Sequence, residues 1–287
     1  MNDGLVIAVA SGKGGTGKTT IATNLALCLS DSGRSVRYLD CDVEEPNGHI
    51  FLKPQINEKI IVTAPVPQVD KNKCIGCGKC GKVCQYGAIV HLGDTNVLTF
   101  EQLCHSCAGC WLLCPVEAIS QKQIEVGEIE MGQSQKVRFD HGRLKIGNVR
   151  SPYLIKQLKK NIDKNAVNIL DVPPGTSCPV VESLKGCDFV LLVSEPTPFG
   201  LNDLKLAVDL VRQMSLPFAV AINRNGCGDE QLEEYCINES INIIMKLPHD
   251  RKIAEAYSSG QMIVETLSEY KKEFESLSEN ILQRLKS

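Results

Sequence analysis

Residues 12–19 carry glycines, two lysines and hydroxyl groups in an order suited to binding phosphate. Glycines let successive backbone N–H groups approach phosphate oxygens. We expect Lys18 to neutralise the β- and γ-phosphates of a nucleotide and the Thr19 hydroxyl to ligate Mg²⁺. A glycine-rich turn that matches by chance is the competing interpretation. The stretch fits G-x-x-x-x-G-K-[ST] and reads Gly12, Lys13, Gly14, Gly15, Thr16, Gly17, Lys18, Thr19, followed by Thr20.

Eight of the fourteen cysteines form a duplicated pattern. The run C-x₂-C-x₂-C-x₃-C extends from Cys74 to Cys84 and again from Cys104 to Cys114. In this spacing three close thiolates bind one [4Fe–4S] cluster and the fourth cysteine ligates the other. Zinc is the competing metal, but its four-ligand sites would not require this run twice. The predicted ligand sets are Cys74, Cys77, Cys80 and Cys114 for one cluster, and Cys84, Cys104, Cys107 and Cys110 for the other.

The elements around these motifs alternate between strands and helices at both ends of the chain. The apolar run 5–10 predicts a strand, 19–30 a helix and 35–40 a second strand. From about residue 54 to 140 the sequence is rich in cysteine, glycine and proline, which indicates an insertion. The alternation then resumes, with a helix at 152–161, strands at 167–171, 189–194, 218–223 and 241–246, and a final helix at 265–286.

This order predicts an α/β fold with a mostly parallel sheet flanked by helices. One domain would be formed by residues 1–55 and 141–287. An inserted small α+β domain resembling a bacterial ferredoxin would span 56–140, although Gln85 stands where the ferredoxin pattern has proline.

The composition favours a folded chain without a membrane or nucleic-acid role. Hydrophobic residues make up 43%, charged residues 23%, and the formal net charge is −3, so nucleic-acid binding is not expected. No apolar run reaches the roughly 18 residues of a membrane span. With no signal peptide in the sequence, we expect a cytoplasmic protein whose cysteines bind metal and do not form disulfides.

The phosphate-binding loop resembles that of the MinD/ParA/nitrogenase-iron-protein superfamily of P-loop ATPases, over most of residues 1–50 and 150–260. The deviant loop of that superfamily carries an additional lysine, matched here by Lys13. The resemblance implies that Lys13 reaches the nucleotide of a partner subunit, much as an arginine finger does, and hence that ATP drives dimerisation. The alternative for Lys13 is a solvated loop residue.

Three acidic residues at strand ends resemble the switches of these ATPases. The resemblance implies that Asp40 lies by the Mg²⁺ shell, Asp42 orients the attacking water, and Asp171 holds Mg²⁺ through water. Exposed, solvated carboxylates are the alternative for Asp40 and Asp42. Asn223 and Arg224 resemble the adenine-recognition segment, with Pro248 near the far side of the base, although asparagine after a strand is more often a turn residue.

Cys178 stands apart from the duplicated pattern. It follows Asp171 by seven positions. In the nitrogenase iron protein, a member of the superfamily that this sequence resembles, a cysteine at this offset ligates an intersubunit cluster. Because the sequence shows no second such ligand, a structural thiol near the switch is the stronger expectation.

Together these features predict an ATPase that uses ATP, Mg²⁺ and two [4Fe–4S] clusters. We expect a homodimer, or a heterodimer with a paralogue, that gates electron transfer to a redox or acceptor protein. An iron–sulfur or metallocluster carrier or assembly ATPase is one alternative, and a positioning ATPase with structural clusters is another. An insertion just after a nucleotide-sensitive loop is the reason to expect coupling.

Overall fold

A computed structural model, which describes residues 4–285, contains one large sheet and one two-stranded sheet within those residues. The large sheet has the order β11-β10-β9-β1-β8-β2-β7-β6-β3, with parallel pairing from β11 to β7. The parallel strands are β1 (Val6–Ala10), β2 (Val36–Asp40), β7 (Val137–Leu144), β8 (Val167–Asp171), β9 (Phe189–Ser194), β10 (Phe218–Asn225) and β11 (Ile243–Pro248). The expected mostly parallel α/β fold is confirmed.

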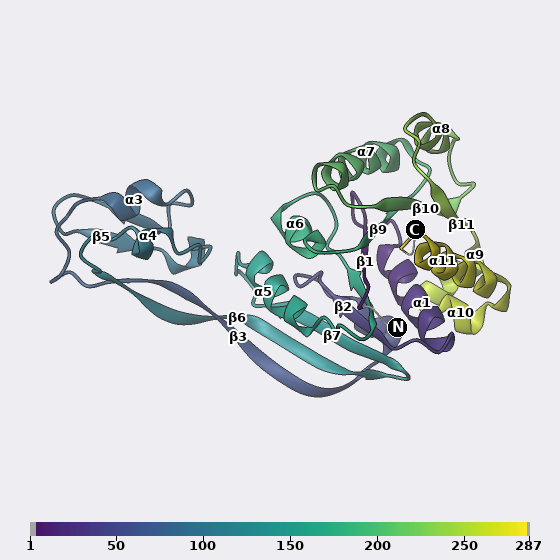
Figure 1. Ribbon diagram of the computed structural model, residues 1–287, viewed down its shortest axis with the longest axis horizontal. Helices are drawn as coiled ribbons and strands as arrows, with labels where there is room; N and C mark the ends of the chain where they lie inside the picture. The colour runs from purple at the N-terminus through teal and green to yellow at the C-terminus, as the bar shows by residue number, and fades with distance from the viewer. Residues whose placement is uncertain (1–3, 286–287) are drawn as a thin grey trace.

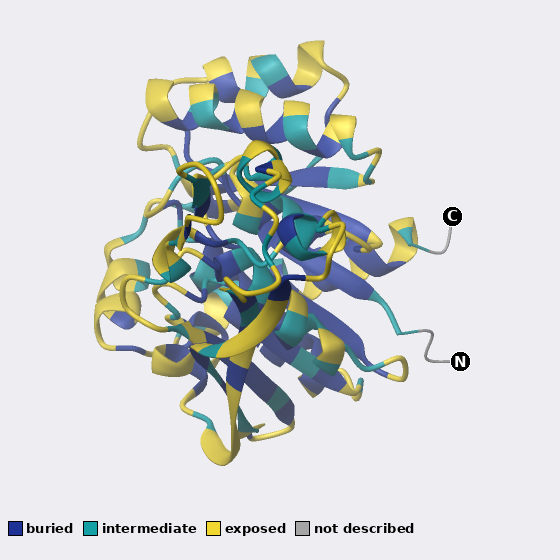
Figure 2. Ribbon diagram, turned by 90° about the vertical axis from the view of Figure 1, so that its left-hand side faces the viewer, coloured by how far each residue is buried: buried dark blue, intermediate teal, exposed yellow. Residues whose placement is uncertain are grey.

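Helices cover both faces of the parallel strands (Figures 1 and 2). Strands β1 and β9 are buried on both sides, which explains their nearly continuous apolar sequences. One face is covered chiefly by α1 (Lys18–Asp31), α2 (Gly48–Leu52), α9 (Arg251–Ser258), α10 (Ile263–Thr266) and α11 (Lys271–Arg284). The other face is covered by α5 (Ser151–Leu158), α6 (Cys178–Leu184), α7 (Pro198–Gln213) and α8 (Gln231–Asn238).

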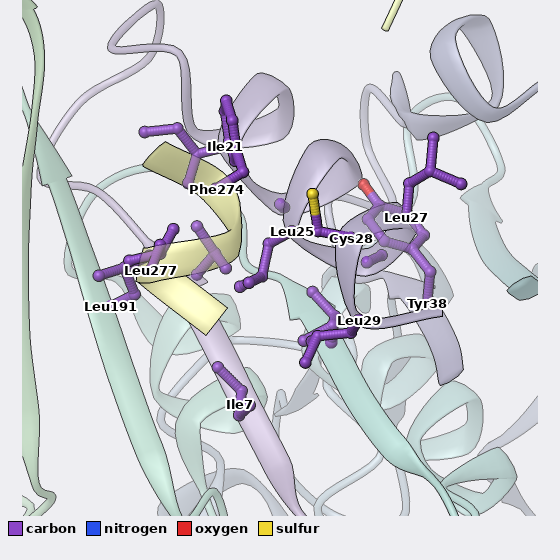
Figure 3. Packing of buried hydrophobic residues seen from close by; sticks show 14 of the residues in the cluster. Ile7, Ile21, Leu25, Leu27, Cys28, Leu29, Tyr38, Leu191, Phe274 and Leu277 are labelled. Carbon is purple, nitrogen blue, oxygen red and sulfur yellow. The ribbon is translucent and has the colours of Figure 1, made fainter. Parts of the chain in front are cut away.

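Alternate residues of β1 belong to the two cores. Ile7 and Val9 point to the first face, where Phe274 of α11 and Leu25 of α1 close over the strands (Figure 3). Val6 and Ala8 belong to the opposite core. This double anchoring fixes β1, and with it the loop that follows, in the middle of the sheet.

Two antiparallel strands at the edge of the large sheet continue beyond it as a long two-stranded ribbon. Strand β3 (Gln55–Val69) pairs antiparallel with β6 (Ile119–Ser134), from Gln55 opposite Gln133 to Val69 opposite Ile119. The ribbon runs beneath α5 and ends in a separate small lobe (Figure 1). We use "small lobe" for residues 70–118, which contain α3 (Lys79–Val83), β4 (Ile89–His91), β5 (Val97–Thr99), the 3₁₀ turn η1 (Glu101–Leu103) and α4 (Gly109–Leu112).

The small lobe is built from two repeats whose equivalent residues lie 30 positions apart, as Cys74 does from Cys104. Gly78 (φ 67°) and Ala108 (φ 72°) precede the two short helices in the same left-handed conformation. The Asp70 N–H donates to Ala118 O at 2.7 Å, and the Phe100 N–H donates to Ala88 O at 2.8 Å. The duplication in the sequence is thus a duplication of backbone geometry.

Three expected boundaries differ from the structure. The division expected after Asp140 falls inside β7, which pairs parallel with β2 along its length up to His141. Polar residues such as Arg138 and Asp140 alternate there with buried Val137 and Phe139, so the strand lacks a continuous apolar run. The strand expected at 241–246 lies at 243–248. The final helix is broken into α10, the 3₁₀ turn η3 (Ser268–Tyr270) and α11, and its expected last residue lies outside the described ones.

Candidate functional site

The phosphate-binding loop lies between β1 and α1, at the carboxyl edge of the parallel strands, where α/β sheets bind ligands. Gly15 (φ 81°) and Gly17 (φ 87°) adopt left-handed conformations that favour glycine. A Cβ at Gly17 would stand 2.1 Å from the Asn223 amide nitrogen, so only glycine fits there. A cavity opens over this loop and is lined by Lys13, Gly14, Gly15, Gly17, Lys18, Thr19, Thr20, Asp42, Asn223, Arg224 and Pro248.

Lys18 and Asp171 form a buried ion pair at the base of this cavity. Burial disfavours the charged form of Lys18, but the attraction of Asp171, reinforced by Asp40 and Asp42, outweighs it and raises the pKa of the lysine. The second carboxylate oxygen of Asp171 accepts a hydrogen bond of 2.7 Å from the Tyr38 hydroxyl. Lys18 therefore stays protonated, and Tyr38 holds its counter-ion in place.

Asp40 lies on the strand next to Asp171 and is fully buried. It accepts hydrogen bonds from the N–H groups of Asp42 (3.1 Å), Asn47 (3.0 Å) and Gly48 (2.8 Å). Burial, reinforced by the negative charge of Asp171, raises the pKa of Asp40 to about 8. This carboxyl group therefore organises the 42–48 segment, a contact that the sequence alone did not indicate.

Asp42 lies nearer the cavity, and burial raises its pKa to about 6 while the charge of Lys18 opposes the rise. Among residues 4–285, no three His, Cys, Asp or Glu side chains converge closely enough to hold one metal ion. The Asp40 carboxylate instead accepts hydrogen bonds from backbone N–H groups. The Asp171 carboxylate contacts Lys18 and Tyr38. Thr19 lines the same cavity. A Mg²⁺ ion here would rely on the Thr19 hydroxyl and on water between itself and the carboxylates.

Lys13 contacts a residue that the sequence analysis missed. Its Nζ lies 2.6 Å from Glu195 Oε1, and Arg224 Nη1 lies 2.9 Å from Glu195 Oε2. The Glu195 side chain is only 10% exposed, whereas that of Lys13 is 30% exposed. Glu195 directly follows β9 and reaches both cations at the carboxyl edge of the sheet. Its position at the carboxyl end of a buried strand, where Asp40 also lies, was the signal that could have identified it.

The residues expected near an adenine base lie on the far side of the loop. The Asn223 side-chain amide donates a 2.8 Å hydrogen bond to Thr16 O and so braces the loop directly. Arg224 is held by Glu195, and Pro248 ends β11 beside the same cavity. His249 and Tyr257 also line this end of the cavity, although neither was expected.

The eight patterned cysteines line two separate cavities in the small lobe. Backbone N–H groups of Ala88 and Ala118 donate to the sulfurs of Cys84 (3.3 Å) and Cys114 (3.2 Å), equivalent contacts in the two repeats. The Ser106 N–H donates to Cys104 Sγ at 3.4 Å. The first cavity is lined by Cys74, Cys77, Cys80 and Cys114, and the second by Cys84, Cys104, Cys107 and Cys110.

The other cysteines lie elsewhere. Cys178 is exposed at the first residue of α6, and Cys227 is exposed in the loop after β10. Cys28, Cys41, Cys187 and Cys236 are buried in the two cores, where burial raises the pKa of each thiol and keeps it protonated. Such protonated, inaccessible thiols are poor metal ligands.

None of the helices in the described part of the chain is both long and apolar enough to cross a membrane.

The sequence matches the profile described as "CobQ/CobB/MinD/ParA nucleotide binding domain" over residues 7–264. A Methanocaldococcus jannaschii protein named only as uncharacterized is 30% identical over 275 residues, 91% of this chain and 92% of its own length. An iron-sulfur cluster carrier protein of Pyrococcus horikoshii is 25% identical over 302 residues, 98% of this chain and 86% of that protein. The Pyrococcus horikoshii OT3 structure titled as the septum site-determining protein MinD with Mg-ADP has a TM-score of 0.61, with 19% identity over 96% of this chain and 95% of that one.

Proposed function

Since this chain belongs to the CobQ/CobB/MinD/ParA nucleotide-binding family and is a MinD/ParA-like ATPase, we propose that its ATP cycle is coupled to two [4Fe–4S] clusters and gates electron transfer to a partner protein. The observation that carries this proposal is the pair of four-cysteine cavities in a lobe held away from the nucleotide cavity by the β3–β6 ribbon. Fully liganded clusters in a separate lobe suit electron transfer better than release.

In the proposed ATP site, the backbone N–H groups of residues 12–17 cradle the phosphates and Lys18 neutralises them. Lys18 exchanges Asp171 for the phosphates, and its raised pKa means that it brings a positive charge. Thr19 ligates Mg²⁺ directly, and Asp40 and Asp171 act through bound water. Asp42 orients the attacking water, for which a partly buried carboxylate beside the cavity is suited.

In the proposed dimer, homomeric or formed with a paralogue, Lys13 contacts the nucleotide of the partner subunit. Within one chain its cation is paired with Glu195, so that pairing must be exchanged for a phosphate in the dimer. The phosphate of the partner's nucleotide replaces Glu195 as the counter-ion of Lys13. Because only bound ATP supplies that phosphate, dimerisation depends on ATP. Asn223, Arg224 and Pro248 would then contact the base.

The eight cysteines fit two clusters by number, arrangement and local hydrogen bonding. In a cube each cysteine ligates a different iron, so four thiolates surround a cavity and do not converge on one point. Backbone N–H groups already point at Cys84, Cys104 and Cys114, and such hydrogen bonds stabilise thiolates. When bound, the clusters would supply one-electron chemistry. The small lobe would carry them at the end of the ribbon.

The decisive experiment is anaerobic ATPase turnover of the full chain with its clusters oxidised and then reduced. Electron gating predicts a different hydrolysis rate in the two states, and altered midpoint potentials when ATP is added. Equal rates together with unchanged potentials would refute gating and would favour a positioning ATPase with structural clusters. Analysis for about eight irons per chain tests the cluster content itself.

An iron–sulfur carrier function is the second candidate, because relatives named as iron-sulfur cluster carrier proteins align with nearly the whole chain. A carrier would lose its clusters to an apo-acceptor protein within minutes and would do so faster with ATP. Retention of all iron in the presence of an apo-ferredoxin, with or without ATP, would refute the carrier function.

A further inference from the structure

Arg150 places a buried guanidinium where the α/β domain meets the small lobe. It is the residue before α5, yet it is only 2% exposed. Nη2 donates to Glu101 O at 2.5 Å, and Nε donates to Ser106 Oγ at 3.2 Å. Ser106 lies within the second cysteine run, and its own N–H donates to Cys104 Sγ. A buried charge with hydrogen bonds to a distant segment is an anchor that is costly to break.

The segment that holds Arg150 is also bonded to the loop after β2. The Leu144 N–H donates to Val43 O at 2.7 Å, one residue beyond Asp42. Lys145 O then accepts from the Asn148 N–H at 3.0 Å. Asn148 Oδ1 accepts from Arg150, at 3.1 Å from its backbone N–H and 3.2 Å from Nη1. Consecutive hydrogen bonds and short chain segments thus lead from the proposed water-orienting aspartate to a cysteine ligand.

This connection reaches only one of the two repeats. Each hydrogen bond that Arg150 donates to the small lobe goes to the second repeat, at Glu101 and Ser106. The equivalent of Ser106 in the first repeat is Gly76, which has no side chain to accept such a bond. A Cβ at Gly76 would stand 2.2 Å from Asp94 O, so the first repeat is closed by its own loop at this point.

We propose that Arg150 is a positioning residue that couples the nucleotide site to the cluster of Cys84, Cys104, Cys107 and Cys110, and leaves the other cluster uncoupled. This inference rests on the proposed function. A change in the loop after β2 on ATP binding would shift residues 144–150, and Arg150 would transmit that shift to the loop between Cys104 and Cys107. Its positive charge also favours the more negative, reduced form of this cluster.

The test is hydrogen–deuterium exchange of the anaerobic, cluster-loaded chain with and without Mg-ATP, in which the two repeats serve as each other's control. ATP is expected to change exchange in peptides covering 101–107 by about threefold or more, and to leave those covering 71–77 unchanged. Arg150→Met should abolish that response. It should also lower the reduced-to-oxidised ratio of one cluster by about threefold at a fixed potential.

Three variants separate charge from contact. Arg150→Lys keeps the charge and should preserve the potential while losing the exchange response. Ser106→Ala removes one hydrogen bond, should weaken the response, and carries the test if Arg150→Met fails to fold. Arg143→Met removes an exposed charge on β7 and should change neither readout. An ATP response that is equal in both repeats, absent from both, or intact in the Arg150 and Ser106 variants would overturn the proposal. Failure of the proposed function would appear separately, as missing iron or missing phosphate release in the wild type.

Discussion

Replacing Glu195 with glutamine should strengthen ATP-dependent dimerisation. Glu195→Gln keeps the shape of the side chain and removes the charge that holds Lys13 at 2.6 Å and Arg224 at 2.9 Å. If Lys13 must leave Glu195 to reach the nucleotide of a partner subunit, the ion pair opposes association. Removing it should therefore favour the dimer.

The exposures of the two side chains set the size of this effect. Two unit charges about 4 Å apart attract by about 4 kcal/mol at an effective dielectric constant near 20. The Lys13 side chain is 30% exposed, so its hydration on release offsets most of that attraction. The Glu195 side chain is only 10% exposed, so it regains little hydration and part of the attraction remains as a net stabilisation of the ion pair. A net value of about 1–2 kcal/mol per ion pair corresponds to dimer affinity that is tighter by about 5- to 30-fold for each subunit that carries the substitution.

Sedimentation velocity with a slowly hydrolysed ATP analogue measures this change directly. Nucleotide affinity is measured in parallel, because Glu195 also positions Arg224. Lys13→Ala should abolish the gain when combined with Glu195→Gln. Glu239→Gln is a matched control, since it removes the carboxylate of a 2.6 Å surface pair with Arg212. Unchanged or weaker dimerisation with normal nucleotide binding, or a gain that survives Lys13→Ala, would refute the reasoning.

Three further predictions follow from the buried charges and thiols. Lys18→Ala should abolish ATP binding and lower the free energy of unfolding in urea by about 3 kcal/mol, because Asp171 is left buried and unpaired; adding Asp171→Asn should recover stability but not binding. The pKa of Asp40 is raised from its ordinary value of 3.8 to about 8, so its contribution to stability is complete below about pH 4 and is lost progressively as pH rises from there to about 8. Thermal melts should show that loss, and Asp40→Asn should remove it. Cys84→Ser should halve the iron content of the anaerobic protein, whereas Cys28→Ser, in a core position, should leave the iron content unchanged.

The local patterns in the sequence determined the general fold and the phosphate-binding loop. The conformation of a glycine-rich loop between an apolar strand and a helix is set by residues close in sequence, so their spacing alone predicts it. The same is true of strands β1 and β9, which are buried on both faces and carry nearly unbroken apolar runs. The cysteine spacing grouped the same thiols that line the two cavities of the small lobe, because a fixed number of residues in a tight loop leaves few geometries.

Strand β7 needed the tertiary structure. Its alternating polar residues are satisfied by partners far along the chain, as Asp140 is by Arg37 at 2.6 Å. A short window of sequence contains no information about such a partner. The division expected at Asp140 therefore fell within a strand of the sheet.

The contacts of single polar residues were also decided only by folding. Glu195 meets Lys13 from a strand that is remote in sequence, Tyr38 meets Asp171, and Arg150 meets Ser106. Each of these pairs exists because neighbouring parallel strands bring residues remote in sequence together, or because the small lobe contacts the residue before α5. Sequence therefore determined which chemical groups this protein carries, and the non-local pairing of strands determined which of them act on one another.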